Sequence, residues 1–293
     1  MPKTSSKPKS EYAIQTVTNA LRMLEVFHTE TEMGVSELAR NLGLHKNNAF
    51  RLLATLELAG YIQQTPATEL YHLGPRCLEL GHAFARSHSL MDRARPILED
   101  LADRFGETSH LGVLSGRQVV HLDGVLPDQL VLTGLRVGQR LDAHCTAMGK
   151  VLLAGEISNR SLAFFSSDTS ASGGAGAAGS ASASASDLDS DQSIEAELTA
   201  ETLTQFTRAT LADPAKLMDE LRAVQLRGYA TDVEEFSEGL RCVAAPVVDA
   251  NARVIAALSL SGPAMRLDEE SLHGRHAEAI TSAAAELSKA LGS

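Results

Sequence analysis

Two glycines, Gly43 and Gly60, divide the stretch between residues 35 and 60 into separate segments. Apolar residues at helical spacing precede each of them. Glycine favours the end of a helix because it adopts left-handed backbone angles without steric cost. The sequence therefore predicts a short helix with Ser36 as its N-cap, a tight turn, and a longer helix from about His45 to Gly60.

The flanking segments complete an order of elements that is typical of one small fold. Residues 17–27 have apolar positions at three- and four-residue steps, which predicts an amphipathic helix ending near His28. Two β-prone runs, residues 61–64 and 70–73, enclose a turn-forming segment and predict a hairpin. Helix, short helix, tight turn, longer helix and hairpin make a winged helix-turn-helix. We expect this mainly α domain to span residues 12–75.

The longer helix of this domain begins with polar side chains. In a helix-turn-helix, the second helix enters the major groove with its N-terminal residues near base edges. Asparagine can form two hydrogen bonds with adenine, lysine reaches guanine or phosphate, and arginine suits phosphate. The candidate DNA-binding residues are Ser36, Arg40, His45, Lys46, Asn47, Asn48 and Arg51. Two alternatives remain open: these residues form only a solvated helix face, or the domain is an adaptor that binds protein instead of DNA.

The net charge of −11, taken over the whole chain, argues against a nucleic-acid partner. Its distribution matters more than the sum. Residues 1–90 contain 9 Lys and Arg against 8 Asp and Glu, and the remaining chain contains 17 against 29, so the two parts carry +1 and −12. The acidity belongs to the second part, and DNA binding by the first part stays possible.

The rest of the chain alternates helical and strand-like patterns. Residues 76–89 predict a linker helix, and residues 90–293 a second domain. Helices are predicted there over residues 90–105, 147–153, 214–227 and 268–291, and strands over residues 109–114, 119–125, 130–135, 242–248 and 254–261. Strands and helices in this order predict an α+β domain with an antiparallel sheet.

Two segments offer almost nothing to bury. Residues 1–11 carry lysines and small polar residues and predict a disordered arm. Residues 166–193 consist mainly of small or acidic residues without apolar periodicity, and they predict a flexible insertion in the second domain.

The sequence favours a cytoplasmic protein. No run of 18 or more apolar residues is present, and no apolar stretch follows the N-terminal lysines as it would in a secretory signal. The three cysteines, Cys77, Cys145 and Cys242, leave one unpaired in any pairing, which fits a reducing compartment.

Polar groups gather at three places in the second domain, next to glycines or strand ends. Residues 144–149 lead into a helix whose first N–H groups suit a carboxylate. Ser259 and Ser261 are two apart on a predicted strand and face the same side. Asp232 and Cys242 complete the set, which predicts a small-molecule pocket. The candidate apolar wall residues are Leu130, Leu141 and Met148.

Several long blocks of sequence occur in a fixed order. They are GVSELARNLGLHKNNAFRLLATLELAGYIQ, YHLGPRCLELG, HLGVLSGRQVVHLDGV, VGQRLDAHCTAMGKVLLA and LRAVQLRGYATDVEEFSEGLRCVAAPVVDANARVIAALSLSGPAMRL. Together they resemble the IclR-type family of bacterial transcriptional regulators over roughly residues 12–290. The chain departs from the family at Asn47 and Asn48, where members commonly have Ser-Thr, so the operator sequence is not carried over. The insertion at residues 166–193 is a second departure.

The resemblance has implications for both domains. It implies a GAF-like fold for the second domain, dimers formed through the winged domain and linker, and tetramers formed through the effector domains. It also implies an effector pocket lined by the matching aspartate, cysteine and paired serines, in which backbone amides at a helix start hold an acid group. The effector-binding residues implied in this way are Asp232, Cys242, Ser259, Ser261, Ala147, Met148 and Gly149.

An enzyme is the rival interpretation. Cys145 beside His144, with Asp232 or Asp123 elsewhere, suggests a nucleophile, a base and an orienting carboxylate, but adjacent residues in a strand seldom face each other. A zinc site is a further alternative, although no CxxC or HxxxH spacing supports it. Its candidate ligands are His110, His121, His144, Cys145 and Cys242. We expect no catalytic residue, metal or cofactor.

The sequence as a whole favours a transcriptional regulator. We expect its winged domain to bind double-stranded operator DNA, and its second domain to bind a small organic acid that modulates this binding. We favour repression released by the effector, because blocking an operator requires no contact with polymerase, although activation is equally compatible with the residues. The expected assembly is a homodimer or homotetramer without membrane contact.

Overall fold

The computed structural model describes residues 12–87, 89–129, 134–168 and 203–292. The chain divides into two compact units, residues 1–88 and 89–293, and each is described here by itself. The predicted arm, Leu130 and most of the predicted insertion lie outside the described residues.

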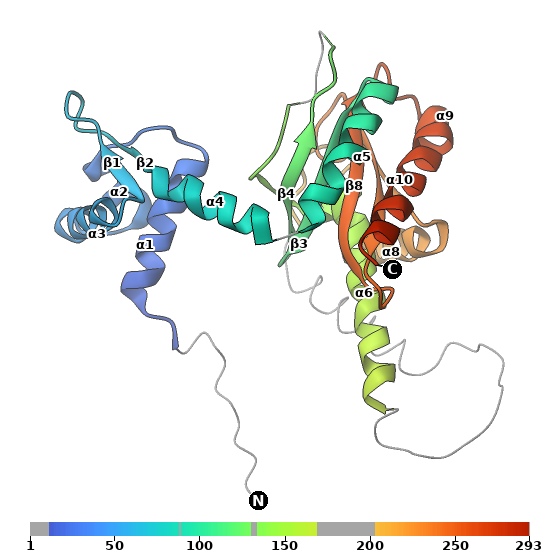
Figure 1. Ribbon diagram of the computed structural model, residues 1–293, viewed down its shortest axis with the longest axis horizontal. Coiled ribbons are helices and arrows are strands. Elements are labelled where there is room, and N and C mark those ends of the chain that lie inside the picture. The colour runs from blue at the N-terminus through green and yellow to red at the C-terminus, as the bar shows by residue number, and fades with distance from the viewer. Residues whose placement is uncertain (1–11, 88, 130–133, 169–202, 293) are drawn as a thin grey trace, which may run out of the picture. The chain divides into compact units, whose positions relative to one another are not determined.

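The first unit contains four α-helices and a hairpin among its described residues (Figure 1). Its core is formed by fully buried side chains such as Met23, Leu38, Leu53 and Ile62. The elements, in chain order, are α1 (Gln15–Glu25), a 3-10 turn (Val26–His28), α2 (Val35–Leu42), α3 (Lys46–Leu58), β1 (Ile62–Gln64), β2 (Tyr71–Leu73) and α4 (Pro75–Ser87). β1 and β2 pair antiparallel, so the predicted winged helix-turn-helix is confirmed.

Glycines end α2 and α3 as predicted, but α2 begins at a different residue from the one predicted. Gly43 has φ +67 and Gly60 has φ +81, the left-handed angles that end a helix. The N-cap of α2 is Gly34 and not Ser36, whose side chain is exposed and makes no cap. The cause is tertiary: Met33 and Tyr71 exchange two backbone hydrogen bonds of 2.9 Å, which hold the chain extended up to Gly34.

The second unit is built on a six-stranded antiparallel sheet. Its strands are β3 (Thr108–Ser115), β4 (Gln118–Val125), β5 (Arg140–Asp142), β6 (Ala230–Val233), β7 (Leu240–Val248) and β8 (Val254–Pro263). They lie side by side in the order β5-β4-β3-β8-β7-β6. The hairpin predicted from residues 242–248 and 254–261 is the pair β7 and β8, which lies between β3 and β6 in this order.

Helices cover both faces of this sheet (Figure 1). α5 (Ser89–Phe105) and α10 (Ala277–Ala290) pack on one face, where Leu98 and Ile280 meet Leu258 and Leu260. α6 (Ala147–Asp168) and α8 (Pro214–Arg227) share a second core with the other face. The predicted α+β architecture with an antiparallel sheet is therefore confirmed. No described helix is long and apolar enough to cross a bilayer.

Three predicted elements need correction. Of the strand predicted at residues 130–135, the part that the structure describes is not a strand; β5 pairs with β4 instead, after a turn at Gly138 whose N–H donates to His121 O at 2.8 Å. α6 continues past Leu153 to Asp168. The helix predicted over residues 268–291 is broken, because Gly274 has non-helical angles between a short helix, α9 (Glu269–Ser271), and α10. β6 was not predicted at all.

Candidate functional site

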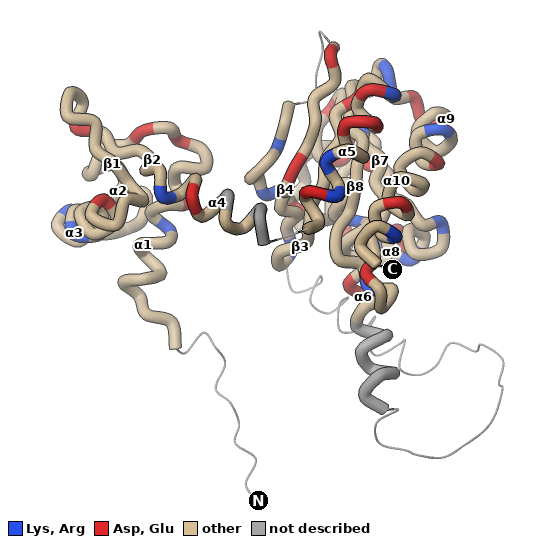
Figure 2. The backbone as a smooth tube through the Cα atoms, viewed as in Figure 1, with Lys and Arg blue, Asp and Glu red and all other residues tan. Residues whose placement is uncertain are grey.

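The beginning of α3 is an exposed polar surface in the first unit. All seven candidate DNA-binding residues have exposed side chains, and five of them lie at or just after the start of α3. Figure 2 marks the basic positions of this helix. Lys46 is the first helical residue, and Arg51 lies on the same helix beyond it. Backbone bonds from Asn48 and Ala49 to His45 O fix the first turn.

Several residues beside this surface were not predicted from the sequence. A groove of about 420 Å³ beside α3 is lined by Asn48 and Arg51 together with Thr16, Asn19 and Phe50. Phe50 is exposed although it is aromatic. In the sequence, Phe50 directly follows Ala49, which was predicted to face the core. That position was the only signal that Phe50 is exposed.

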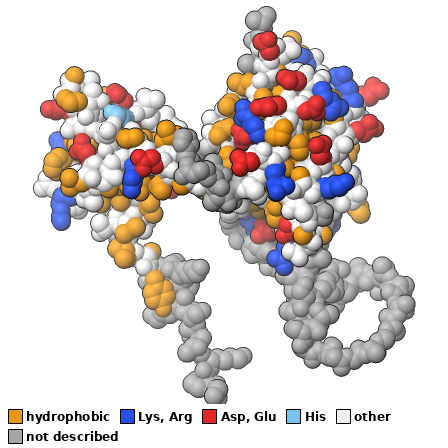
Figure 3. Space-filling model, in the orientation of Figure 1, with side chains coloured by type: hydrophobic (Ala, Val, Ile, Leu, Met, Phe, Trp, Pro, Cys, Tyr) orange, Lys and Arg blue, Asp and Glu red, His pale blue; other side chains and the backbone are white. Residues whose placement is uncertain are grey.

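α1 presents a second exposed surface, which is apolar. Ile14 at its N-cap, Val17 and Leu21 are separated by steps of three and four residues, so they lie on one side of the helix, and all three are exposed. Figure 3 shows hydrophobic side chains gathered along this part of the first unit. Leu78 and Phe84 of α4 are exposed as well.

In the second unit, strand register aligns three of the predicted pocket residues. Asp232 on β6 pairs with Cys242 on β7, and Cys242 pairs with Ser261 on β8. Residues directly opposite each other in neighbouring strands face the same side of the sheet. Ser259, two residues from Ser261, faces that side too. The sheet thus presents a polar row to the face that α6 covers.

This row borders a small cavity. Its volume is about 30 Å³, which is room for one or two water molecules. Of the predicted residues, those that line it are Leu141, Ala147, Met148, Asp232, Cys242, Ser259 and Ser261. The lining residues that were not predicted for this pocket are His121, Arg136, Thr146, Phe236 and Leu240, although His121 was named as a candidate zinc ligand and Thr146 lies in the polar segment at residues 144–149. Arg136 and Phe236 belong to loops, which have no apolar periodicity from which the side that a residue faces could be predicted.

Gly149 is the predicted residue that does not line the cavity. Its N–H donates to Thr146 Oγ1 at 3.1 Å, so Thr146 is the N-cap of α6. A Cβ on Gly149 would overlap the backbone of Ala143. Because Gly149 has no Cβ, the start of α6 can pack closely against the backbone of Ala143. Ala147 and Met148 are the first two helical residues, whose N–H groups have no acceptor within the helix.

Asp232 is the buried carboxyl group of this cavity, with 0% exposure. Its Oδ1 accepts the Glu235 N–H at 2.7 Å, and its Oδ2 has no hydrogen-bond partner in the described chain. Burial, and then the nearby charge of Glu235, raise the pKa of Asp232 to about 7. Near neutral pH this carboxyl group is therefore present in both protonation states and can donate as well as accept.

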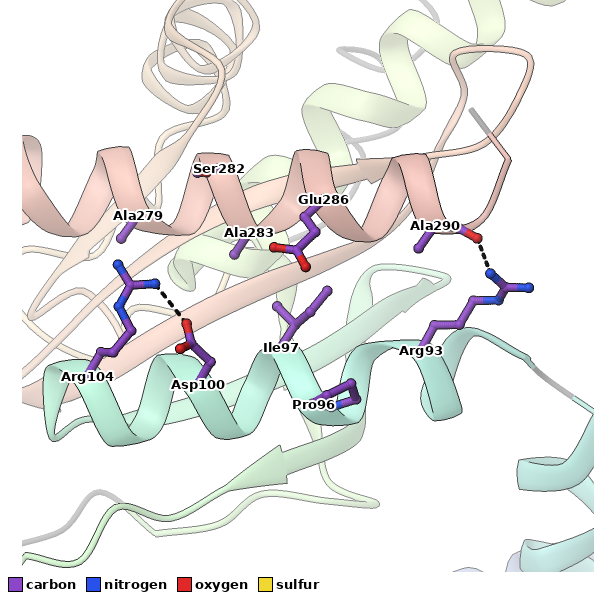
Figure 4. Close-up of a pocket in the computed structure, with 10 residues that line it drawn as sticks. All are labelled: Arg93, Pro96, Ile97, Asp100, Arg104, Ala279, Ser282, Ala283, Glu286 and Ala290. Atoms are coloured by element: carbon purple, nitrogen blue, oxygen red, sulfur yellow. Dashed lines mark hydrogen bonds and ion pairs between the residues drawn. The ribbon is translucent and has the colours of Figure 1, made fainter.

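A larger groove of about 520 Å³ lies between α5 and α10, on the other face of the sheet (Figure 4). Its two arginines are already bound within the unit: Arg104 binds Asp100 at 2.8 Å, and Arg93 donates to Ala290 O. No unpaired buried group points to a ligand among the described residues that line it. The smaller cavity is the better candidate for binding.

The structure also places the residues named for the enzyme and zinc interpretations. Cys145 is buried, and its burial, together with Asp232 and Asp142, raises the pKa of the thiol to about 12. His144 Nε2 instead lies 2.9 Å from Thr204 O, a backbone acceptor. Across the described ranges, no cluster of three or more His, Cys, Asp or Glu side chains is arranged to hold a metal ion.

Comparison with known proteins agrees with this architecture. The model of the IclR helix-turn-helix domain matches residues 16–66, and the model of the bacterial transcriptional regulator IclR C-terminal region matches residues 82–172 and 175–289. The chain belongs to the IclR family of bacterial transcriptional regulators. It is therefore a DNA-binding transcriptional regulator with an effector-binding domain, in a family made up of regulators.

Individual relatives extend over nearly the whole chain. The HTH-type transcriptional regulator XynR of Escherichia coli K12 is 36% identical over 95% of this chain and 98% of its own. The transcriptional repressor IclR of the same organism is 28% identical over 88% of this chain and 83% of its own.

Two solved structures have the same fold. The IclR protein of Thermotoga maritima is 26% identical, with TM-score 0.66, over 96% of this chain and 100% of its own. An IclR homologue of Microbacterium hydrocarbonoxydans in complex with 4-hydroxybenzoate is 22% identical, with TM-score 0.72, over 94% of this chain and 98% of its own. The second similarity concerns the fold alone.

Proposed function

We propose that this IclR-family regulator reads operator DNA with the start of α3. The observation that carries the proposal is the exposed set of polar side chains at the N-terminal end of the second helix of a helix-turn-helix. Asn47 and Asn48 contact base edges, Lys46 contacts a base or phosphate, and Arg40 and Arg51 contact phosphates. Ser36 and His45 complete the contact surface. The hairpin tip carries Glu69 and no basic residue, so hydroxyl and backbone groups there approach the duplex.

The cavity on the sheet is the proposed effector site, and a small organic acid is the proposed effector class. The N–H groups of Ala147 and Met148 at the start of α6 attract a carboxylate. Ser259, Ser261 and Asp232 supply hydrogen bonds. A complex with an aromatic acid, 4-hydroxybenzoate, is known for a protein of the same fold.

The proposed assembly is a dimer in which exposed apolar residues of α1, Ile14, Val17 and Leu21, are covered by a second copy. A symmetric dimer meets two operator half-sites about one helical turn, roughly 34 Å, or a multiple of that apart. Dimers can pair further into tetramers through the second units. An effector changes DNA binding only if its affinity differs between arrangements of the dimer. Release of a repressor by the effector is the direction we propose.

Catalysis is not part of this proposal. The thiolate is the reactive form of cysteine, and the raised pKa of Cys145 keeps its thiol protonated at neutral pH.

The test of DNA reading combines operator selection with two substitutions. DNA retained by the purified protein is sequenced, and binding to the selected operator is measured at several salt concentrations. Lys46→Ala and Arg51→Ala are each expected to weaken binding and to lower the salt slope by about 1 if a phosphate contact is lost. Lys289→Ala, an exposed lysine of the second unit, is the matched control. Equal binding by all four proteins contradicts the proposed interface.

A further inference from the structure

The start of α3 carries one large apolar side chain among its polar ones. Phe50 is 55% exposed, whereas Ala49 and Leu53 of the same helix are fully buried in the core of the first unit. An aromatic ring stabilises a protein mainly through the apolar surface that it removes from water. The core of this unit leaves more than half of the Phe50 ring uncovered, so that surface is available to a binding partner.

The position of Phe50 along the helix places it on the face that is proposed to meet DNA. An α-helix has about 3.6 residues per turn, so residues three and four apart lie on the same side. Phe50 comes four residues after Lys46 and three residues after Asn47. The ring therefore lies one turn further along the helix than these two side chains, on the same side.

The charges around this ring are positive. Lys46 precedes Phe50 on the same side of α3, and Arg51 directly follows it. The first turn of α3 has no acidic residue, and Glu57, the only acid of this helix, comes about two turns after Phe50. A positive potential attracts phosphate groups. The charge around Phe50 therefore favours a nucleic-acid duplex as the partner of this face.

The groove beside Phe50 is separate from the surface proposed for the dimer contact. On α1 it is lined by Thr16 and Asn19, which are polar and three residues apart. Successive residues of a helix are rotated by about 100°, so these two lie on a different side of α1 from the exposed apolar residues Val17 and Leu21. A second copy that covers the apolar side of α1 therefore does not have to cover Phe50.

We propose that Phe50 recognises a thymine in each operator half-site through the C5-methyl group of that base. The inference rests on the proposed reading of DNA by α3. Among the four standard bases, only thymine presents a methyl group in the major groove. An apolar ring in contact with this methyl group removes both surfaces from water, which favours thymine over a base that lacks it. Asn47 and Asn48 recognise bases by hydrogen bonds, and Phe50 adds an apolar criterion to theirs.

The experiment compares thymine with uracil, which differs from thymine only in lacking the methyl group. The full-length protein selects its operator from random DNA, and synthetic duplexes then carry uracil in place of one thymine per half-site, position by position. Fluorescence anisotropy at fixed salt concentration gives the dissociation constants. At one position per half-site we expect uracil to weaken binding by about fourfold for each methyl group removed, the effect of one apolar carbon that leaves a buried contact.

Variants then assign this preference to Phe50. Phe50→Ala should bind the thymine and uracil duplexes equally, within about 1.5-fold, whereas Phe50→Leu keeps an apolar side chain and should keep a preference of about twofold or more. Neither substitution removes a charge, so the salt slope should stay that of wild type. Leu58→Ala is the matched control, because it removes an apolar side chain that is 91% exposed at the other end of α3 and should keep the wild-type preference. Circular dichroism verifies folding, and Phe50→Gln carries the comparison if Phe50→Ala does not fold.

The inference is overturned if no thymine of the operator is sensitive to uracil, if the sensitivity persists in Phe50→Ala, or if Leu58→Ala loses it equally. A lower salt slope in Phe50→Ala also overturns it, because the substitution has then displaced a phosphate contact. If the protein still selects a specific operator in those cases, and Lys46→Ala and Arg51→Ala weaken its binding, the proposed reading of DNA stands and only the role of Phe50 is wrong. If wild-type protein selects no specific DNA, the proposed function itself is contradicted.

Discussion

Lys150 Nζ lies 2.5 Å from Glu235 Oε1, and the lysine side chain is only 2% exposed. The same ammonium group lies 3.4 Å from Glu220 on α8. The backbone N–H of Glu235 also holds Asp232 Oδ1, so this ion pair connects α6 and α8 to the wall of the effector cavity.

Removing the lysine of this pair should destabilise the second unit strongly. Lys150→Met leaves Glu235 buried without its cation, and breaking a buried pair in this way costs about 3–5 kcal/mol. The loss should shrink at low pH, because a protonated Glu235 needs no counterion. Urea unfolding at two pH values measures it.

The matched control for Lys150→Met is Arg76→Met. Arg76 binds Glu79 at 2.8 Å on the surface of α4, and exposed pairs contribute about 1 kcal/mol or less. If Lys150→Met lowers the free energy of unfolding no more than the control does, the buried pair is no more stabilising than an exposed one.

Asp232 predicts a pH dependence of stability with a defined sign. Its pKa is about 7 in the folded protein against an ordinary 3.8, so the native state binds more protons between these values. Stability from this group is therefore lost as pH rises from about 4 to 7, by up to about 4 kcal/mol. Asp232→Asn removes this loss. The free energy of unfolding of wild type and variant is compared at pH 5 and pH 8.

The difference between the two proteins should move in favour of Asp232→Asn at the higher pH. Titrating groups that do not interact with Asp232 are shared by both proteins, so they cancel in the comparison. Parallel pH profiles for the two proteins mean that Asp232 titrates in its ordinary range.

Two helical glycines should respond to alanine in opposite directions. In α4, a Cβ at Gly81 meets no atom within 4 Å, so Gly81→Ala should stabilise the helix by about 0.5–1 kcal/mol. In α6, a Cβ at Gly149 overlaps the Ala143 backbone, so Gly149→Ala should destabilise by about 1–3 kcal/mol. Calorimetric unfolding transitions show both effects. A stabilised Gly149→Ala protein contradicts the close approach of Ala143.

The exposed apolar residues of α1 predict that charge placed there prevents dimer formation. Val17→Asp and Leu21→Asp put a carboxylate where a second copy would otherwise exclude water, at a large desolvation cost. We expect the sedimentation coefficient to fall and affinity for a two-half-site operator to approach that for a single half-site. Leu226→Asp changes a leucine on α8 that is even more exposed, and it should do neither. An unchanged oligomer in the α1 variants places the interface elsewhere.

Local chemistry was sufficient to predict many element boundaries. The left-handed glycines Gly43, Gly60 and Gly228 end helices wherever they occur, because their preference depends only on their own missing side chain. Apolar periodicity predicted α1, α3, α8 and the pair β7 and β8 for the same reason, since it reflects each segment's own buried face. Resemblance to a family then identified Asp232, Cys242 and the two serines as candidates.

The assembled cavity depended on contacts that no local pattern encodes. Ser36 does not cap α2, because Tyr71 pairs with Met33 and moves the start of the helix. Arg136 and Phe236 are far apart in the chain and meet only because two loops of the sheet converge. The sequence by itself determined most of the helices and strands and what chemistry they carry. Tertiary structure alone decided which polar groups are buried together without partners, because burial and register arise only when the strands pair.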